Sequence, residues 1–173
     1  MLKLYPEETP AKVVEEAPPT FRHGGNKLFF VSLGCPRNRV DTEVMLGILL
    51  KAGYEPSDTL EEADYLIVNT CGFLEAAREE SLATIGELEA QKKEGAKVIV
   101  TGCMVQTHDK VIREHFPQVD YLLGSGDVEG ILGAIQAKEQ GSAITSARSY
   151  LEAGEVPRTI STPSHYAYLK IAE

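Results

Sequence analysis

The sequence predicts an α/β domain in which a parallel β-sheet carries helices on both faces. Two observations lead to this fold class. Four short, continuous apolar runs follow one another along residues 26–137, and a stretch with helical periodicity comes after each of them. Such an alternation of strands and helices implies parallel strands joined by right-handed crossovers.

The four apolar runs are the predicted strands. They cover residues 28–31, 65–68 and 98–100, and a weaker fourth run covers residues 119–123. Short runs without polar interruptions are typical of strands that are buried on both faces, as the strands of a parallel sheet are.

The first predicted helix follows the first strand and carries Val40, Val44 and Ile48 at intervals of four residues. Asn38 can cap this helix, because a short polar side chain accepts hydrogen bonds from the free N–H groups at a helix N-terminus. Gly53 can end it, because glycine readily adopts the left-handed backbone that closes many helices.

Three further helices are predicted, one after each remaining strand. The second has an apolar and small-residue stripe over residues 74–88 and can end at Gly95. The third covers residues 105–116. The fourth is centred on residues 128–135, with Asp127 as a plausible N-cap.

The residues on either side of this domain have a different composition. Residues 1–25 combine four prolines with acidic residues and little apolar surface, which predicts a disordered tail. Residues 138–164 are rich in Ser, Thr, Gly and Pro and are predicted to be a linker. Residues 165–173 include a run that alternates like a strand, so the sequence predicts the start of a further domain, truncated at Glu173.

Charge and composition restrict the partners and the compartment. The chain has 26 acidic residues against 17 Lys and Arg and a formal net charge of −9, so a broad basic surface for nucleic acid is not expected. No apolar run approaches the ~18 residues that a membrane span needs. The N-terminus carries no secretory signal. These features predict a cytoplasmic location without membrane contact.

Three cysteines occupy equivalent places in successive strand–helix units. Cys35, Cys71 and Cys103 each come just after one of the first three predicted strands. The carboxyl ends of parallel strands meet at one edge of the sheet, where open α/β folds place their ligands. Neighbouring strands are about 4.8 Å apart, so the three thiols are expected to lie close together. Helix N-termini behind them favour the thiolate form.

Three thiols at one edge, without a secretion signal, indicate a soft metal site rather than a disulfide framework. A structural zinc usually takes four protein ligands. A 4Fe–4S cluster held by three cysteines would leave one iron open for an outside ligand. Ordinary buried cysteines also explain the positions, because free cysteine is among the most buried residue types. The intervals of 36 and 32 residues match no compact zinc signature.

Two other groups of residues are weaker candidates for ligand contacts. Residues 124–127 (GSGD) follow the fourth strand and could approach a phosphate, although a turn with a helix cap explains them equally well. Arg37 and Arg39 lie beside Cys35 and could bind an anion, although arginines in a loop are usually solvated.

Three motifs, in this order, resemble the signatures of the methylthiotransferase family. Residues 32–45 (SLGCPRNRVDTEVM) resemble the first signature, and residues 69–73 (NTCGF) and 101–104 (TGCM) resemble the second and third. Residues 168–173 (YLKIAE) resemble the first strand of the radical-SAM barrel that follows in the family. The resemblance extends over residues 27–173.

This resemblance implies a flavodoxin-like N-terminal domain and an enzyme with two 4Fe–4S clusters. It implies that Cys35, Cys71 and Cys103 hold the first cluster, and it assigns no catalytic side chain to this sequence. The second cluster and S-adenosyl-L-methionine would belong to the radical-SAM domain, whose cysteine loop would follow Glu173. The 173 residues alone are therefore expected to be an inactive part of a methylthiotransferase.

The residues of the first motif help to identify the substrate. Family members that act on transfer RNA usually read Gly-Cys-Gln-Met-Asn, whereas residues 34–38 read GCPRN. This is closer to the members that methylthiolate the β-carbon of an aspartate in small-subunit ribosomal protein twelve. Two alternatives stay open. One is a methylthiotransferase of a modified adenosine in transfer RNA, and the other is a non-enzymatic flavodoxin-like binding module with three inert core cysteines.

Overall fold

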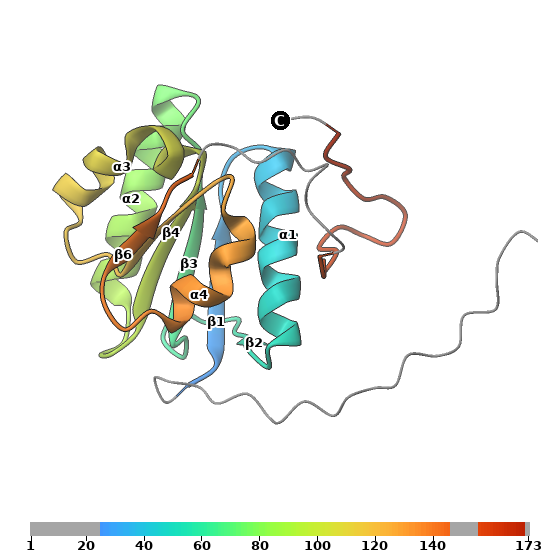
Figure 1. Cartoon of the computed structure of the whole chain (residues 1–173), viewed down its shortest axis with the longest axis horizontal. Coiled ribbons are helices and arrows are strands. Elements are labelled where there is room, and N and C mark those ends of the chain that lie inside the picture. Colours follow the sequence, from blue (N-terminus) through green and yellow to red (C-terminus); the bar gives the residue numbers. More distant parts are fainter. Residues whose placement is uncertain (1–24, 146–155, 172–173) are drawn as a thin grey trace, which may run out of the picture.

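The computed structural model describes residues 25–145 and 156–171, and its architecture confirms the predicted α/β class (Figure 1). Strands and helices alternate along the chain. Their order is β1 (Lys27–Ser32), α1 (Pro36–Lys51), β2 (Glu55–Pro56), β3 (Tyr65–Thr70), α2 (Glu75–Gln91), β4 (Lys97–Gly102), α3 (Cys103–His115), β5 (Tyr121–Gly124), the short 3-10 helix η1 (Val128–Gly130), α4 (Ile131–Gln136) and β6 (Gly141–Ala143).

The six strands form one sheet in the order β2-β1-β3-β4-β5-β6, and every neighbouring pair is parallel. The strand order reverses between β1 and β3, as it does in flavodoxin-like sheets. The register aligns the carboxyl ends of the central strands, since Ser32 pairs with Asn69 and Thr70 pairs with Gly102. The segments that follow β1, β3 and β4 therefore leave the sheet at one edge.

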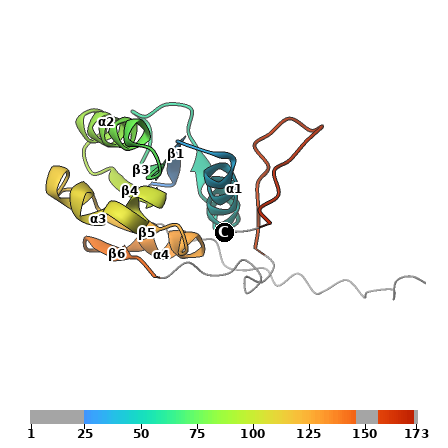
Figure 2. The same cartoon turned by 90° about the horizontal axis from the view of Figure 1, so that it is seen from above.

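Two apolar layers sandwich the sheet, because successive residues of each buried strand point to opposite faces. On β3, Ile67 packs beneath α1 and α4, whereas Leu66 and Val68 pack beneath α2 and α3. The view from above separates the two helix pairs (Figure 2). The predicted placement of helices on both faces is thus confirmed.

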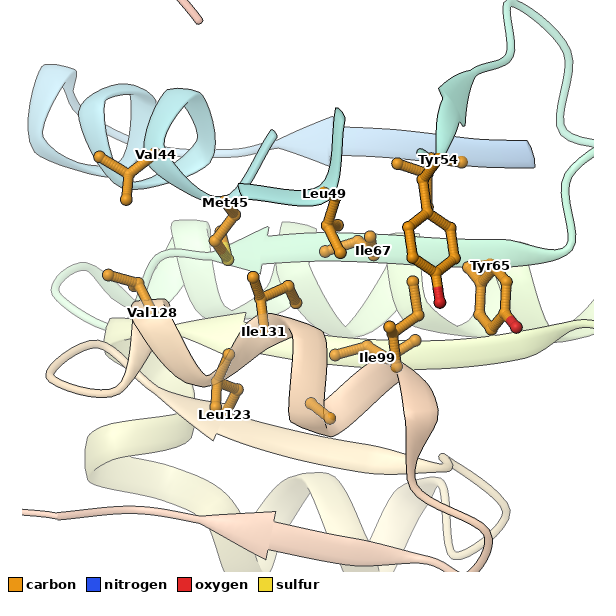
Figure 3. Packing of buried hydrophobic residues seen from close by; sticks show 13 residues of the cluster. Val44, Met45, Leu49, Tyr54, Tyr65, Ile67, Ile99, Leu123, Val128 and Ile131 are labelled. Atoms are coloured by element: carbon orange, nitrogen blue, oxygen red, sulfur yellow. The ribbon is translucent and has the colours of Figure 1, made fainter. Parts of the chain in front are cut away.

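The layer between α1 and the sheet is tightly filled (Figure 3). Met45 and Leu49 of α1 are fully buried and pack with Ile67. At the amino end of the sheet, the rings of Tyr54 and Tyr65 meet edge to face with their centroids 5.6 Å apart. Burial, together with the neighbouring Tyr54, raises the pKa of the Tyr65 hydroxyl to about 12. Tyr65 therefore stays neutral and closes this end of the core.

The start of α1 differs from the prediction. The helix begins at Pro36 with Cys35 as its N-cap, so Asn38 is not the cap. Proline is well suited to the first helical position because its missing N–H would have no partner there. The other end agrees with the prediction, since Gly53 follows the last turn with a φ of 87°.

Of two other predicted helix ends, one is confirmed in position and one is not. Asp127 is the N-cap residue of η1, as predicted, but its carboxylate makes no cap bond and instead accepts hydrogen bonds from the backbone N–H and the hydroxyl of Thr145. Helix α2 ends at Gln91, and Gly95 lies in the turn that leads to β4. Asp127 thus keeps the predicted position and uses its side chain for a tertiary contact, whereas Gly95 serves a turn rather than the end of α2.

The chain beyond α4 departs furthest from the expectation. Strand β6 pairs with β5, so the sheet extends into residues predicted to be a linker. Residues 166–171 do not form the predicted strand, because a strand needs a neighbouring strand to pair with, and no strand of the described residues pairs with this segment. The predicted tail up to residue 24, and residues 146–155 of the predicted linker, lie outside the described residues. Within the described part, no helix is long and apolar enough to cross a membrane.

Residues 156–171 lie along α1 (Figure 1). The buried carboxylate of Glu43 accepts hydrogen bonds from Arg158 Nε at 2.9 Å and from the backbone N–H of Ser161 at 2.8 Å. Burial opposes the ionisation of Glu43, but the hydrogen bonds from Ser161 and Arg158 outweigh it and lower the pKa of the carboxyl. A second buried pair joins Lys170 Nζ to Asp41 at 3.1 Å. Helix α1 thus holds this segment through two acids of its N-terminal half.

Candidate metal centre

The three cysteines meet at the carboxyl edge of the sheet, as the sequence predicts. Cys35 is the N-cap of α1, Cys71 directly follows β3, and Cys103 is the first residue of α3. All three line a single pocket of about 490 Å³. The pocket lies where β1 and β3 send their helices to opposite faces, the place where α/β sheets of this order bind ligands.

Glycines beside the cysteines allow the three loops to pack this closely. A Cβ on Gly34 would lie 2.8 Å from the Cβ of Cys71, and a Cβ on Gly72 would lie 2.9 Å from the carbonyl oxygen of Cys103. Gly102 has a φ of 101°, and a Cβ there would lie 2.3 Å from Asn69 Oδ1. Side chains at these positions would force the cysteine loops apart.

The thiols differ in exposure. Cys35 is exposed, whereas Cys71 and Cys103 are half-buried. Burial raises the pKa of the Cys103 thiol; the positive charge of Arg37 opposes this, while Asp41 and the other two cysteines add to it. The mutual influence of the cysteines follows from their closeness. Cys103 therefore remains a neutral thiol unless a cation compensates for the buried negative charge.

The donor set of three thiols fits an iron–sulfur cluster. Thiolates are the ligands that iron–sulfur clusters take from proteins. In the described part of the chain, no three His, Cys, Asp or Glu side chains are grouped so that they could hold one metal ion. In a cluster, each thiolate binds a different iron, so the sulfurs surround a shared volume and do not converge on one atom. Three thiols spread around one pocket match that arrangement.

One wall of the pocket is apolar and exposed to solvent. Phe73 and Leu74 follow Cys71 and expose 86% and 60% of their surfaces, and Ala77 of α2 lies beside them. Arg37 is the positive residue of this pocket. It can offset the negative charge that three thiolates would bring.

The other weak candidates lie elsewhere. Arg39 lines a smaller pocket of about 210 Å³ together with Ser32, Cys35 and Tyr168. Cys35 therefore lines both pockets, whereas Arg37 lines the larger one and Arg39 the smaller one. Residues 124–127 do not line the cysteine pocket, and the Asp127 side chain is bound to Thr145.

Two residues of this centre were not identified as site residues from the sequence. The buried hydroxyl of Ser81 on α2 accepts a hydrogen bond from the N–H of Cys71 at 3.3 Å. The buried amide of Asn38 contacts all three cysteine loops. In the sequence, Ser81 stands out only as a small residue of the apolar stripe of its helix, and Asn38 only as a short polar residue that can cap a helix.

Comparison with known proteins places the sequence among bacterial relatives. Residues 27–124 match the family described as "Uncharacterized protein family UPF0004". A protein of Protochlamydia amoebophila (strain UWE25), named "Ribosomal protein uS12 methylthiotransferase RimO", is 69% identical over 159 residues, which are 92% of this chain and 34% of that protein.

Proteins of the same name show that the similarity is not confined to one group of bacteria. The protein of Chlamydia caviae is 63% identical over 148 residues, or 86% of this chain and 32% of that protein. The protein of Anaeromyxobacter sp. (strain K) is 45% identical over 152 residues, or 85% of this chain and 32% of that protein. The chain spans about a third of the length of the curated relatives it matches.

Proposed function

The chain belongs to the UPF0004 family, and from this membership and its three pocket-lining cysteines we infer that it is the cluster-bearing part of a methylthiotransferase. The observation that carries this proposal is the position of Cys35, Cys71 and Cys103. Each follows its own parallel strand, and all three open into one pocket at the carboxyl edge of the sheet.

These cysteines would hold a 4Fe–4S cluster. A cluster bound by three thiolates supplies an iron with an open position, where a sulfur atom could be presented for transfer. The chain's own residues prepare the site. Burial raises the pKa of the Cys103 thiol, and Arg37 offers a positive charge to the loaded, anionic centre. Phe73 and Leu74 give the pocket an apolar wall.

We propose uS12, the small-subunit ribosomal protein twelve, as the substrate of the whole enzyme, because the relatives bear that name and the first motif departs from the wording usual for enzymes of transfer RNA. The modified atom would be the β-carbon of an aspartate. A radical-SAM domain outside these residues would bind the second cluster and S-adenosyl-L-methionine. Residues 1–173 alone are proposed to be inactive. The acidic net charge of −9 agrees with a protein substrate, and ribosomal modification would place the enzyme in the cytoplasm.

Anaerobic reconstitution with iron and sulfide tests the cluster directly. We expect the purified chain to take up about four iron and four sulfide and to develop the broad brown absorption of a cluster. Cys35→Ala, Cys71→Ala and Cys103→Ala should each sharply reduce the uptake, because two thiolates rarely hold such a cluster. Ser57→Ala, a change in the loop after β2, serves as the control.

Unchanged iron and sulfide content in all three cysteine variants would overturn the assignment of the ligands. Uptake of zinc without any iron chromophore would favour a different metal. Incubation of the full-length enzyme with uS12 and with transfer RNA, followed by mass spectrometry, decides the substrate. A mass increase on transfer RNA alone would overturn the proposal for uS12.

A further inference from the structure

One buried side chain connects the three cysteine loops. Asn38 lies in the first turn of α1 and is 1% exposed. Its amide nitrogen donates to the carbonyl oxygens of Leu33 and Thr70, both at 2.9 Å. Its amide oxygen faces the sulfur of Cys103 at 3.7 Å, where the thiol is the donor.

Each contact reaches a different cysteine loop. Leu33 lies two residues before Cys35, and Thr70 directly precedes Cys71. The third contact is made with the Cys103 sulfur itself. The two N–H groups and the oxygen of one amide are therefore all used to join the loops that follow β1, β3 and β4.

The backbone that carries this amide is bonded to the sheet. Asn69, at the end of β3, donates from its side-chain nitrogen to the backbone carbonyl of Asn38 at 2.7 Å and to the hydroxyl of Thr42 at 3.1 Å. Thr42 in turn donates to the hydroxyl of Ser32 at the end of β1. The first turn of α1 is thus bonded to both strands that flank the switch in strand order.

We propose that Asn38 is a positioning residue that sets the spacing of Cys35, Cys71 and Cys103 for the cluster. The proposal rests on the proposed function, which supplies the cluster. The side chains that are closest in size or polarity do not make the same contacts. Aspartate has no N–H groups for the two carbonyls, serine has a single donor, and alanine leaves both carbonyls and the thiol without partners. Partners that orient metal ligands typically change metal affinity by roughly 10- to 100-fold when they are removed.

A comparison of three variants separates positioning from plain stability. Asn38→Ala removes every contact of the amide, and Asn38→Ser keeps one short donor in case the first variant folds poorly. Leu49→Ala is the control, because Leu49 is a fully buried residue of the same helix and does not line the cysteine pocket. Thermal unfolding of the apo-proteins establishes how much stability each variant loses.

Two readouts are needed, and the first requires no cluster. In the apo-protein, pulse labelling with N-ethylmaleimide and mass spectrometry measures the reaction rate of each cysteine. We expect Asn38→Ala to speed the labelling of Cys103 several-fold, and Asn38→Ser to have a smaller effect. The second readout is the loss of the reconstituted cluster to an iron chelator. Asn38→Ala should speed this loss about 10-fold or more, with an altered electron paramagnetic resonance spectrum of the reduced cluster.

The outcomes distinguish the alternatives. Wild-type labelling and wild-type cluster retention in Asn38→Ala would overturn the proposal. Equal changes in Leu49→Ala and Asn38→Ala would also overturn it, because the effect would then follow stability alone. If the wild-type chain takes up no iron, the proposed function fails, and the labelling rates still decide whether Asn38 positions the thiols.

Discussion

The two edges of the sheet are built from different chemistry. At the amino edge, polar groups close the strands against one another. Asp64, just before β3, accepts a hydrogen bond from the N–H of Lys27 at 2.9 Å and pairs with Lys93 at 2.7 Å. Burial opposes ionisation, but these bonds and the Lys93 charge lower the pKa of the Asp64 carboxyl. Asp120, before β5, binds the N–H of Val98 in the same way.

The carboxyl edge is left much more open. It carries three free thiols, two exposed apolar side chains at Phe73 and Leu74, and a pocket between them. The buried side-chain oxygen of Asn69 has no hydrogen-bond partner there. An unpaired buried oxygen costs about 1–3 kcal/mol.

From this difference we expect the amino edge to determine the stability of the fold and the carboxyl edge to determine the binding of the cluster. Paired ions, aromatic contacts and satisfied backbone groups at the amino edge hold the strands together. The three thiols and the exposed side chains of Phe73 and Leu74 at the carboxyl edge instead line the pocket that we propose holds the cluster. If this holds, variants at one edge should change stability and variants at the other should change the cluster.

The largest effect is expected at the amino edge, from Tyr65→Ala. Removing this buried ring leaves a cavity beneath Tyr54 and should lower the free energy of unfolding by about 3–5 kcal/mol, as measured by urea denaturation at low temperature. Cluster content per folded molecule should stay at the wild-type level, because Tyr65 lies at the opposite end of β3 from Cys71. Tyr65→Phe keeps the ring and is the matched control. If Tyr65→Ala lost cluster content in proportion to its loss of stability, the two edges would not have separate roles.

A smaller, local effect is expected from Glu43→Gln. Charged hydrogen bonds to Arg158 and Ser161 hold residues 156–171 against α1, so their loss should cost about 2 kcal/mol of local stability. Hydrogen exchange of the Ser161 amide measures it. Glu61→Gln, an exposed acid elsewhere, should leave that exchange unchanged. Unchanged exchange in Glu43→Gln would show that the segment is held by other contacts.

The ionisation of Glu43 should make the attachment of residues 156–171 to α1 depend on pH. The folded pKa of Glu43 lies below its ordinary value of 4.5, so the ionised form is the one that the fold stabilises. The contribution is fully present above that ordinary pKa and is lost as the pH falls through the lower, folded pKa. The difference in Ser161 exchange between wild type and Glu43→Gln should therefore shrink on acidification below pH 4.5. A difference that grows as the pH falls would contradict this sign.

Most of the sheet could be predicted because its central strands are buried on both faces. That burial produces uninterrupted apolar runs, and the strand ends then place the cysteines without further information. Strands β2 and β6 could not be found in this way. They are two and three residues long, contain Glu55, Pro56 and Gly141, and exist only because a neighbouring strand pairs with them.

The cysteine motifs also predicted the family, and the relatives confirm that resemblance. The side chains that support the site could not be predicted from the sequence. Asn38 satisfies the local rule for a helix cap, and only the folded structure brings Thr70 and Cys103 to its amide. The Glu43–Arg158 and Asp41–Lys170 pairs join residues 115 and 129 positions apart. No local pattern encodes partners at such distances.

The smallest change in stability, with a visible change in the cluster, is expected at the carboxyl edge from Phe73→Ser. Phe73 is 86% exposed, so the free energy of unfolding should change by no more than about 0.5 kcal/mol. Its ring nevertheless lines the pocket beside Cys71, and we expect it to slow the approach of oxygen to a cluster bound there. We expect the brown absorption of the reconstituted chain to decay faster in air. Ile171→Ser is the matched control, because Ile171 is 88% exposed and does not line the cysteine pocket. Equal decay rates in the two variants would show that exposed apolar surface at this edge does not protect the cluster, and the contrast between the edges would then rest on the thiols and Asn38 alone.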